Sequence, residues 1–191
     1  MENNRTPKIY VAGPDLFQKY WPDKVGEIMR FAEAIGAEAL VPHMPAQHPA
    51  EGLSITGTPE DAKKPYAFCV NAVTEADVVI GNLNPFRGDE PDSGTIVELT
   101  MAKMLGKIVI GHTLDSRTLE EKLTVTKDEN GVCRCSSGAI VERFDLPVNL
   151  MVALTCDEIV FGGVGVAMIR AVATWKARSK SITRENMRQI T

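Results

Sequence analysis

A run of acidic side chains lies between an apolar segment and a helix-like segment of this chain. The four acids are Asp89, Glu90, Asp92 and Glu98. The apolar segment, residues 77–81, predicts a buried strand, and residues 95–106 predict the helix that follows. Carboxylates at the carboxyl end of a central strand lie where α/β folds place their ligands. Two carboxylates at unequal depth can act as nucleophile and acid when a carbon–oxygen or carbon–nitrogen bond at a sugar is cleaved.

Glu98 is the candidate nucleophile of this segment. It falls about one turn inside the predicted helix, where the helix dipole favours an ionised carboxylate. A surface or capping glutamate is the alternative at such a position. Gly94, in the turn before it, lets the backbone come close to a ligand. Asp92 has two interpretations that the sequence leaves open: it caps the helix, or it protonates a leaving nitrogen because burial and the Glu98 charge raise its pKa.

A second candidate group surrounds the end of the first predicted strand, residues 8–12. Tyr10 lies in this strand, Gly13 and Pro14 end it, and Phe17 follows. The glycine permits close approach of a ligand, and the aromatic rings can stack on a flat base. The pattern is not the Gly-x-Gly-x-x-Gly fingerprint, so the sequence does not predict a dinucleotide site.

Strand-like and helix-like segments alternate along the chain, which is typical of a parallel sheet with crossover helices. We expect strands at residues 8–12, 38–42, 77–81, 107–111 and 158–161, and helices at 22–35, 65–75, 95–106, 150–155 and 165–180. The sequence therefore predicts an α/β fold, a flavodoxin-like doubly wound five-stranded parallel sheet with helices on both faces. A single domain would span residues 1–191. Its ligand site would lie where the strand order reverses, beside the loops after the first and third strands.

Three segments fall outside this alternation. Residues 43–64 are rich in Pro, Gly, Thr and Glu and predict a lid or binding loop, with a surface insertion as the alternative. Residues 113–145 contain Asn130-Gly131, a hairpin-turn signal, and predict a small hairpin over the carboxyl edge of the sheet. The polar tail, residues 181–191, is expected to fray or to pack on a neighbour.

Composition narrows the classes of partner. The net charge of −4 disfavours nucleic acid or an anionic membrane as the main partner. No apolar run approaches the ~18 residues of a membrane span, and residues 1–7 lack an export signal, so we expect a cytoplasmic protein. The cysteines are Cys69, Cys133, Cys135 and Cys156. Their spacing is not that of zinc ligands, so we expect free thiols and no metal site.

Three segments together resemble the nucleoside 2-deoxyribosyltransferase family: residues 9–17, 77–98 and 147–151. The most specific part is residues 84–95 followed by Glu98, which is closest to the protozoan members. The resemblance implies a five-stranded α/β fold and the transfer of 2-deoxyribose between nucleobases, without a cofactor. The substrates would be a deoxynucleoside and a free nucleobase.

The resemblance also implies roles for individual residues. Glu98 would be the nucleophile and form a deoxyribosyl ester, Asp92 would contact and help to protonate the base, and Tyr10 would orient the nucleophile. The residues expected at the substrate are Gly13, Pro14, Phe17, Cys69, Asp89, Gly94, Asn149 and Met151. Among these, Asn149 and Met151 would reach into the site of a neighbouring subunit, which implies a homodimer or a larger homo-oligomer.

Two positions depart from the family pattern. Cys69 stands eight positions before Asp77, where some members carry Asp or Asn. A thiol cannot hold a base by paired hydrogen bonds, so the base preference stays open. The C-terminal tyrosine of bacterial members has no counterpart in residues 188–191.

The residues fit this chemistry on their own terms. A 2-deoxyribosyl centre lacks the electron-withdrawing 2-hydroxyl, so an oxocarbenium-like transition state forms readily and one glutamate can capture it. A second base then attacks the same face with ping-pong kinetics, while water in its place gives hydrolysis. Two alternatives stay open. One is an N-glycoside hydrolase of nucleoside 5′-monophosphates, for which Arg87 is the basic candidate, and the other is a non-catalytic nucleotide-sensing module.

Overall fold

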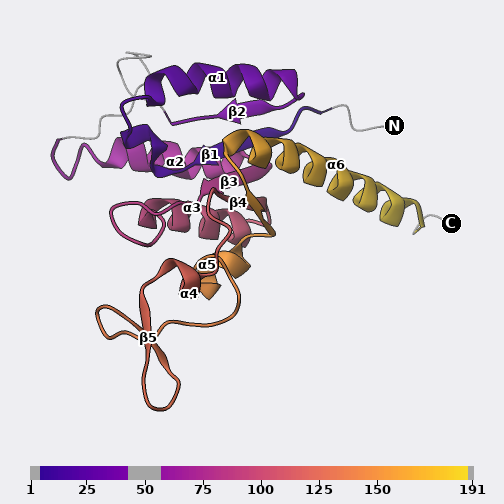
Figure 1. Ribbon diagram of the computed structural model, residues 1–191. Coiled ribbons are helices and arrows are strands. Elements are labelled where there is room, and N and C mark those ends of the chain that lie inside the picture. The colour runs from indigo at the N-terminus through magenta and orange to yellow at the C-terminus, as the bar shows by residue number, and fades with distance from the viewer. Residues whose placement is uncertain (1–4, 43–56, 189–191) are drawn as a thin grey trace.

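The computed structural model describes residues 5–42 and 57–188, and in these ranges the chain forms a five-stranded parallel sheet (Figure 1). Its strands are β1 (Lys8–Ala12), β2 (Glu38–Leu40), β3 (Val78–Asn82), β4 (Ile108–Thr113) and β7 (Glu158–Phe161). Their order is β2-β1-β3-β4-β7, so the direction of winding reverses between β1 and β3. This order is flavodoxin-like and confirms the predicted α/β fold.

Helices cover both faces of the sheet. The helix α1 (Trp21–Ala34) and the helix α6 (Val164–Arg188) pack on one face, and α2 (Lys63–Glu75), α3 (Ser93–Met104) and α5 (Leu150–Thr155) pack on the other. A short 3-10 helix, η1 (Pro14–Phe17), connects β1 to α1. Because both faces are covered, the central strands β1, β3 and β4 are buried along almost their whole length.

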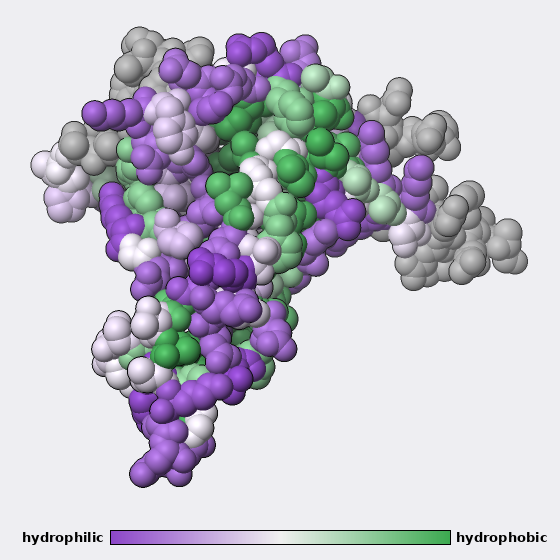
Figure 2. Space-filling view, viewed as in Figure 1, coloured by the Kyte–Doolittle hydropathy of each residue, from purple (hydrophilic) through white to green (hydrophobic). Residues whose placement is uncertain are grey.

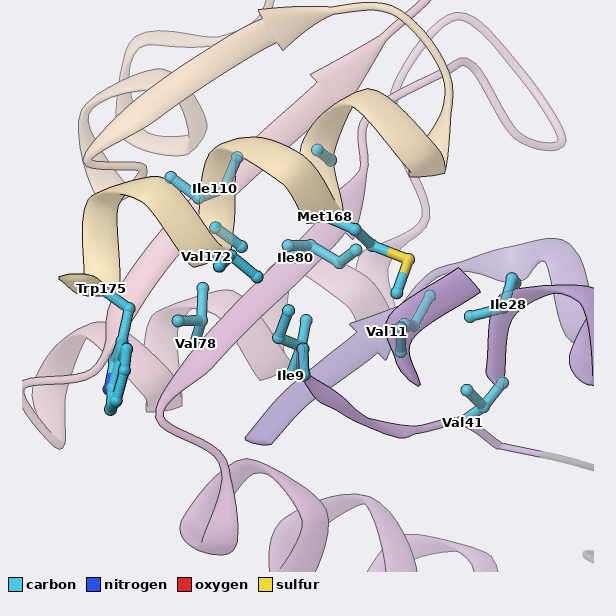
Figure 3. Packing of buried hydrophobic residues seen from close by; sticks show 14 of the residues in the cluster. Ile9, Val11, Ile28, Val41, Val78, Ile80, Ile110, Met168, Val172 and Trp175 are labelled. Atoms are coloured by element: carbon cyan, nitrogen blue, oxygen red, sulfur yellow. The ribbon is translucent and has the colours of Figure 1, made fainter. Parts of the chain in front are cut away.

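Neighbouring residues of each strand contribute to two separate cores. On the face of α1 and α6, the apolar core contains side chains from both helices and from the strands (Figure 3): Ile9, Val11, Ile28, Val41, Val78, Ile80, Ile110, Met168, Val172 and Trp175. On the opposite face, Tyr10 and Val79 pack against α2, α3 and α5. This alternation sends the Tyr10 ring toward the helix that carries Glu98.

Two glycines let elements approach the sheet closely. A Cβ at Gly81 of β3 would lie 2.7 Å from Leu99 Cδ1, so α3 rests directly on the backbone of β3. A Cβ at Gly111 of β4 would lie 2.5 Å from Leu83 Cδ1. The absence of a side chain at Gly81 therefore fixes the height of α3, and with it the depth of the neighbouring Glu98.

Residues between β4 and α5 form a separate excursion. A short helix, α4 (Leu119–Lys122), precedes an antiparallel hairpin of β5 (Val125–Lys127) and β6 (Cys133–Cys135). The turn is closed by the Gly131 N–H, which donates to Asp128 O at 2.9 Å, with Gly131 at a φ of 76°. Figure 1 shows the hairpin projecting away from the sheet, instead of lying over its carboxyl edge as the sequence suggested. A small apolar cluster of its own holds the excursion together: Leu119, Cys133 and Val141.

The element ends differ from those predicted by one or two residues in most cases, which is the usual scatter of helix and strand boundaries. The exception is α6, which runs to Arg188 instead of ending near residue 180. Residues 166–188 contain no Gly or Pro, so nothing in the sequence stops the helix, and the prediction of a frayed tail from residue 181 is wrong for 181–188. Residues 43–56 of the predicted lid or binding loop lie outside the described residues.

Figure 2 shows apolar side chains gathering over β7 and the first part of α6, where Phe161, Val166 and Ile169 are exposed.

None of the helices in the described part of the chain combines the length and apolarity that crossing a bilayer requires.

Candidate active site

Tyr10 and Glu98 meet beneath the point where the strand order reverses. Tyr10 Oη donates a hydrogen bond to Glu98 Oε1 at 2.7 Å. Tyr10 belongs to β1 and is fully buried, whereas Glu98 lies on α3 and is partly exposed. The contact therefore joins β1 to α3, the helix that follows β3, and it fixes the direction of the Glu98 carboxylate.

The environment of Glu98 raises its pKa above the usual glutamate range. Burial is the largest cause and the Asp92 charge adds to it, while hydrogen bonds from Tyr10 and Cys69 act in the opposite direction. The expectation that the helix dipole holds this group ionised is wrong in its physical cause. Glu98 is the sixth residue of α3 (Ser93–Met104), beyond the first turn in which the dipole acts. The two hydrogen bonds are what favour the ionised form.

Cys69 of α2 is the third member of this group. Its thiol lies beside Tyr10 and Glu98 and influences the pKa of both. Burial raises the pKa of the thiol to about 11, and burial with the Glu98 charge raises the pKa of Tyr10 well above its usual range. Both groups therefore stay protonated at neutral pH and act as neutral donors to the carboxylate. All four cysteines carry free thiols, as the sequence predicted.

Asp92 caps the helix that carries Glu98. Its Oδ2 accepts the Thr95 N–H at 2.9 Å and the Thr95 hydroxyl at 3.1 Å. Within the described residues these contacts use Oδ2, so Oδ1 stays available to a ligand. A Cβ at Gly94 would lie 3.0 Å from Asp92 Oδ2, so the glycine also leaves room for the cap. Its expected role in close approach of a ligand stays a prediction.

The loop after β1 holds the other predicted residues. A Cβ at Gly13 would lie 2.9 Å from Asn82 Cβ, so this glycine allows β1 and β3 to converge at their ends. Pro14 is buried and begins η1. Phe17 ends η1, is 41% exposed, and stacks on Phe86 with a centroid separation of 5.8 Å and an interplanar angle of 18°. An exposed ring at this place can serve as one wall for a flat ligand.

A polar network links the strand ends, and the sequence reasoning missed it. Asn82 Nδ2 donates to Asp15 Oδ2 at 2.7 Å, and Asn82 Oδ1 accepts the Asn84 N–H at 3.0 Å. Asn84 Oδ1 in turn accepts the Leu114 N–H at 2.9 Å, which reaches the end of β4. The available signal was the placement of amide side chains at and just after the end of a buried strand. His112 of β4 lies nearby, with burial as the main cause of its lowered pKa.

The residues expected at a subunit boundary lie on α5, which packs against α3. Asn149 caps α5: its Oδ1 accepts the Met151 N–H at 2.9 Å, and its Nδ2 donates to Glu142 Oε2 at 3.1 Å. Glu142 also accepts the Leu150 N–H. The Met151 side chain is 70% exposed.

Asp89, another residue expected at the substrate, is exposed in the loop after β3. Burial is the largest cause of the raised pKa of Glu90, and the Asp89 charge adds to it.

The arrangement holds the Glu98 carboxylate in a fixed direction, and a second carboxylate, Asp92, lies six residues earlier at the start of the same helix. Burial brings the Glu98 pKa closer to neutrality, and two neutral donors orient the group. Across the described residues, no three His, Cys, Asp or Glu side chains gather as they would around a metal ion. The geometry is suited to covalent catalysis at an electrophilic carbon by a carboxylate.

Comparison with known proteins identifies the family of the chain. Residues 9–151 match the family described as nucleoside 2-deoxyribosyltransferase. A 2-deoxyribosyltransferase from Leishmania mexicana is similar in structure, with 27% sequence identity, a TM-score of 0.65, and coverage of 87% of this chain and 97% of that chain. A conserved protein from Enterococcus faecalis V583 shares the fold at 19% identity, with a TM-score of 0.53 and coverage of 89% and 99%. No curated protein matches the chain in sequence.

The family match spans most of the 191 residues and includes Tyr10, Cys69, Asp92, Glu98 and the start of α5. The chain therefore belongs to the nucleoside 2-deoxyribosyltransferase family, whose members are enzymes of glycosyl transfer at nucleosides.

Proposed function

We propose that this protein transfers 2-deoxyribose from a deoxynucleoside to a free nucleobase through an ester on Glu98, without a cofactor. The observation that supports it most directly is the 2.7 Å hydrogen bond from Tyr10 Oη to Glu98 Oε1. This bond holds a partly buried carboxylate in a fixed direction below the point where the strand order reverses. The family and the similarity to the Leishmania mexicana enzyme, which its name describes as a 2-deoxyribosyltransferase, support the substrate class.

The first half of the reaction forms the ester. A Glu98 oxygen bonds to C1′ of the sugar as the C1′–N bond breaks, and the electron pair of that bond leaves with the base. The base takes up a proton from solvent as it leaves, and Asp92 Oδ1, the oxygen that the helix cap does not use, is placed to relay that proton to the base nitrogen. The raised pKa of Glu98 makes it a stronger nucleophile than an ordinary carboxylate, while the hydrogen bonds from Tyr10 and Cys69 keep it ionised.

The second half of the reaction returns the enzyme to its starting state. A second nucleobase attacks C1′ from the face that the first base left and gives up its N–H proton to solvent by the reverse of the first relay, the ester bond breaks, and Glu98 regains its negative charge. Two displacements at one carbon give overall retention and ping-pong kinetics. Water in place of the second base gives the free sugar, so hydrolysis is the expected side reaction.

Substitution of Glu98 tests this mechanism. Glu98→Ala and Glu98→Gln are expected to abolish base exchange, measured by chromatography of a deoxynucleoside with and without a second free base. In the wild-type protein, mass spectrometry of a quenched reaction should find a deoxyribosyl adduct on the peptide that contains Glu98. Turnover close to wild type in either variant refutes the mechanism. Products from water alone, whatever base is added, identify an N-glycoside hydrolase instead.

We also propose that a second copy of the chain covers α3 and α5. Met151 and Leu154 of α5 are 70% and 68% exposed, and Val97 of α3, on the helix next to them, is exposed as well. Apolar side chains on two adjacent helices are typical of a subunit interface. Met151→Glu is expected to lower the mass seen by analytical ultracentrifugation and to reduce activity per subunit. A wild-type protein that sediments as a monomer contradicts this part of the proposal.

A further inference from the structure

The loop after β3 carries a cation that lies over two aromatic rings. The Arg87 guanidinium carbon is 4.6 Å from the centroid of Phe86 and 5.2 Å from the centroid of Phe17. The two rings stack on each other, and Phe17 comes from η1 after β1. The cluster therefore joins the two loops that flank the reversal of strand order.

The backbone at Arg87 is held in an uncommon conformation. Its φ is 56°, in the left-handed region that a residue with a Cβ rarely adopts. Gly88 follows with a φ of 154°, and the Phe86 N–H donates to Glu90 O at 3.0 Å to close the turn. A strained residue of this kind persists only where surrounding contacts fix it. The contacts present here are the turn hydrogen bond from Phe86 to Glu90 and those of the Arg87 guanidinium with the rings.

Asp89 and Glu90 lie on the same short loop as Arg87. Even so, no carboxylate oxygen of the described residues lies within 4.0 Å of the Arg87 guanidinium, so it forms no ion pair with them. Arg87 is exposed, and its guanidinium lies over the two rings. An arginine plane can stack on an aromatic face and remain hydrated at its edge. The guanidinium therefore connects the loop after β3 to η1, and we call this contact the tie.

We propose that Arg87 is a positioning residue: its guanidinium ties residues 85–91 to η1 and holds Phe17 in place as a wall of the nucleobase site. The consequence for the nucleobase rests on the proposed function, whereas the tie itself is a property of the free protein. Glu98 and Tyr10 lie on other elements, so the tie acts on binding of the base and leaves the chemical step unchanged.

Three substitutions separate the side chain from the backbone. Arg87→Gly suits a φ of 56° better than arginine does, so it removes the guanidinium without adding strain. Arg87→Gln removes the cation and keeps the bulk. Arg87→Lys keeps the charge but loses the plane that spans both rings. The matched control is Arg170→Gln: Arg170 lies on α6, and its guanidinium pairs with Glu158 of β7.

Two measurements test the tie. In the free protein, hydrogen–deuterium exchange of residues 85–91 should be faster in Arg87→Gly and Arg87→Gln than in the wild type and in Arg170→Gln. In the enzyme, KM for the deoxynucleoside should rise about 5- to 30-fold in these two variants, as expected for the loss of two exposed cation–π contacts, and kcat should change by less than about 2-fold. Arg87→Lys should lie between.

Unchanged exchange together with unchanged KM in Arg87→Gly overturns the proposal. So does a rise in KM for a deoxynucleoside 5′-monophosphate with none for the uncharged nucleoside, because the guanidinium would then bind a phosphate. A wild-type protein without turnover refutes the proposed function, while the exchange measurement still decides whether the tie exists.

Discussion

Removal of one hydroxyl group, in Tyr10→Phe, tests how the site keeps its nucleophile ionised. The Tyr10 ring packs in the core between β1 and α3, and phenylalanine preserves that packing. What is lost is the 2.7 Å hydrogen bond from Tyr10 Oη to Glu98 Oε1. The substitution therefore isolates one electrostatic contact within an otherwise unchanged site.

The size of the effect follows from the kind of bond. A hydrogen bond to a charged group contributes about 1.5–3 kcal/mol, and one pKa unit corresponds to about 1.4 kcal/mol. Burial already raises the Glu98 pKa and the Tyr10 bond lowers it, so loss of the bond raises the pKa further. In the proposed mechanism the reactive form is the carboxylate, so the acid limb of the rate profile should move to higher pH.

The assay is the pH profile of kcat/KM for base exchange between about pH 4 and 9. Tyr10→Phe should lose activity near pH 6 and recover most of it on the alkaline plateau. Tyr20→Phe, which removes an exposed hydroxyl that donates to Asp15, should keep the wild-type profile. An acid limb at the wild-type position in Tyr10→Phe, or a plateau lost by more than about 100-fold, refutes the reasoning.

Three further perturbations probe stability. In the folded protein the Glu98 pKa is raised, so the stability that Glu98 contributes falls as pH increases from the unfolded pKa of about 4.3 through the folded pKa. Glu98→Gln should therefore raise Tm at pH 7, and the gain should vanish below about pH 4. An equal Tm of the two proteins at pH 7 contradicts this. Asp92→Ala should lower the free energy of unfolding by about 1 kcal/mol through loss of the cap, and Asp92→Asn should cost only a few tenths, both read by urea denaturation. Gly81→Ala should destabilise by about 1–3 kcal/mol because its Cβ meets Leu99, whereas Gly163→Ala, with no neighbouring atom within 4 Å, should cost less than half as much.

The order of elements and the place of the site could be predicted from sequence patterns. Continuous apolar runs mark buried parallel strands, and the polar loops after residues 12 and 82 lie on either side of the reversal. The cap formed by Asp92 was one of the two interpretations that the sequence left open, and it could be named because capping depends on local spacing. Local rules of this kind need no knowledge of distant residues.

What escaped prediction depends on contacts between segments far apart in the sequence. The pKa of Glu98 is determined by burial and by Tyr10 and Cys69, which lie on β1 and α2, and no spacing rule connects them. The close approach of Asn82 to Gly13 and of the Asp92 carboxylate to Gly94 was not predicted either. The contact of Arg87 with Phe17 is likewise visible only once two loops are placed side by side.

The contact between Tyr10 and Glu98 spans 88 residues of chain. It forms only after β3 has joined β1 and α3 has docked. An N-terminal fragment therefore lacks the oriented Glu98 carboxylate, and so does a nascent chain that is still emerging from the ribosome. Long-range closure of this kind is slow relative to helix formation. Recovery of turnover during refolding should accordingly lag behind the circular dichroism signal, which makes catalysis itself a late marker of assembly.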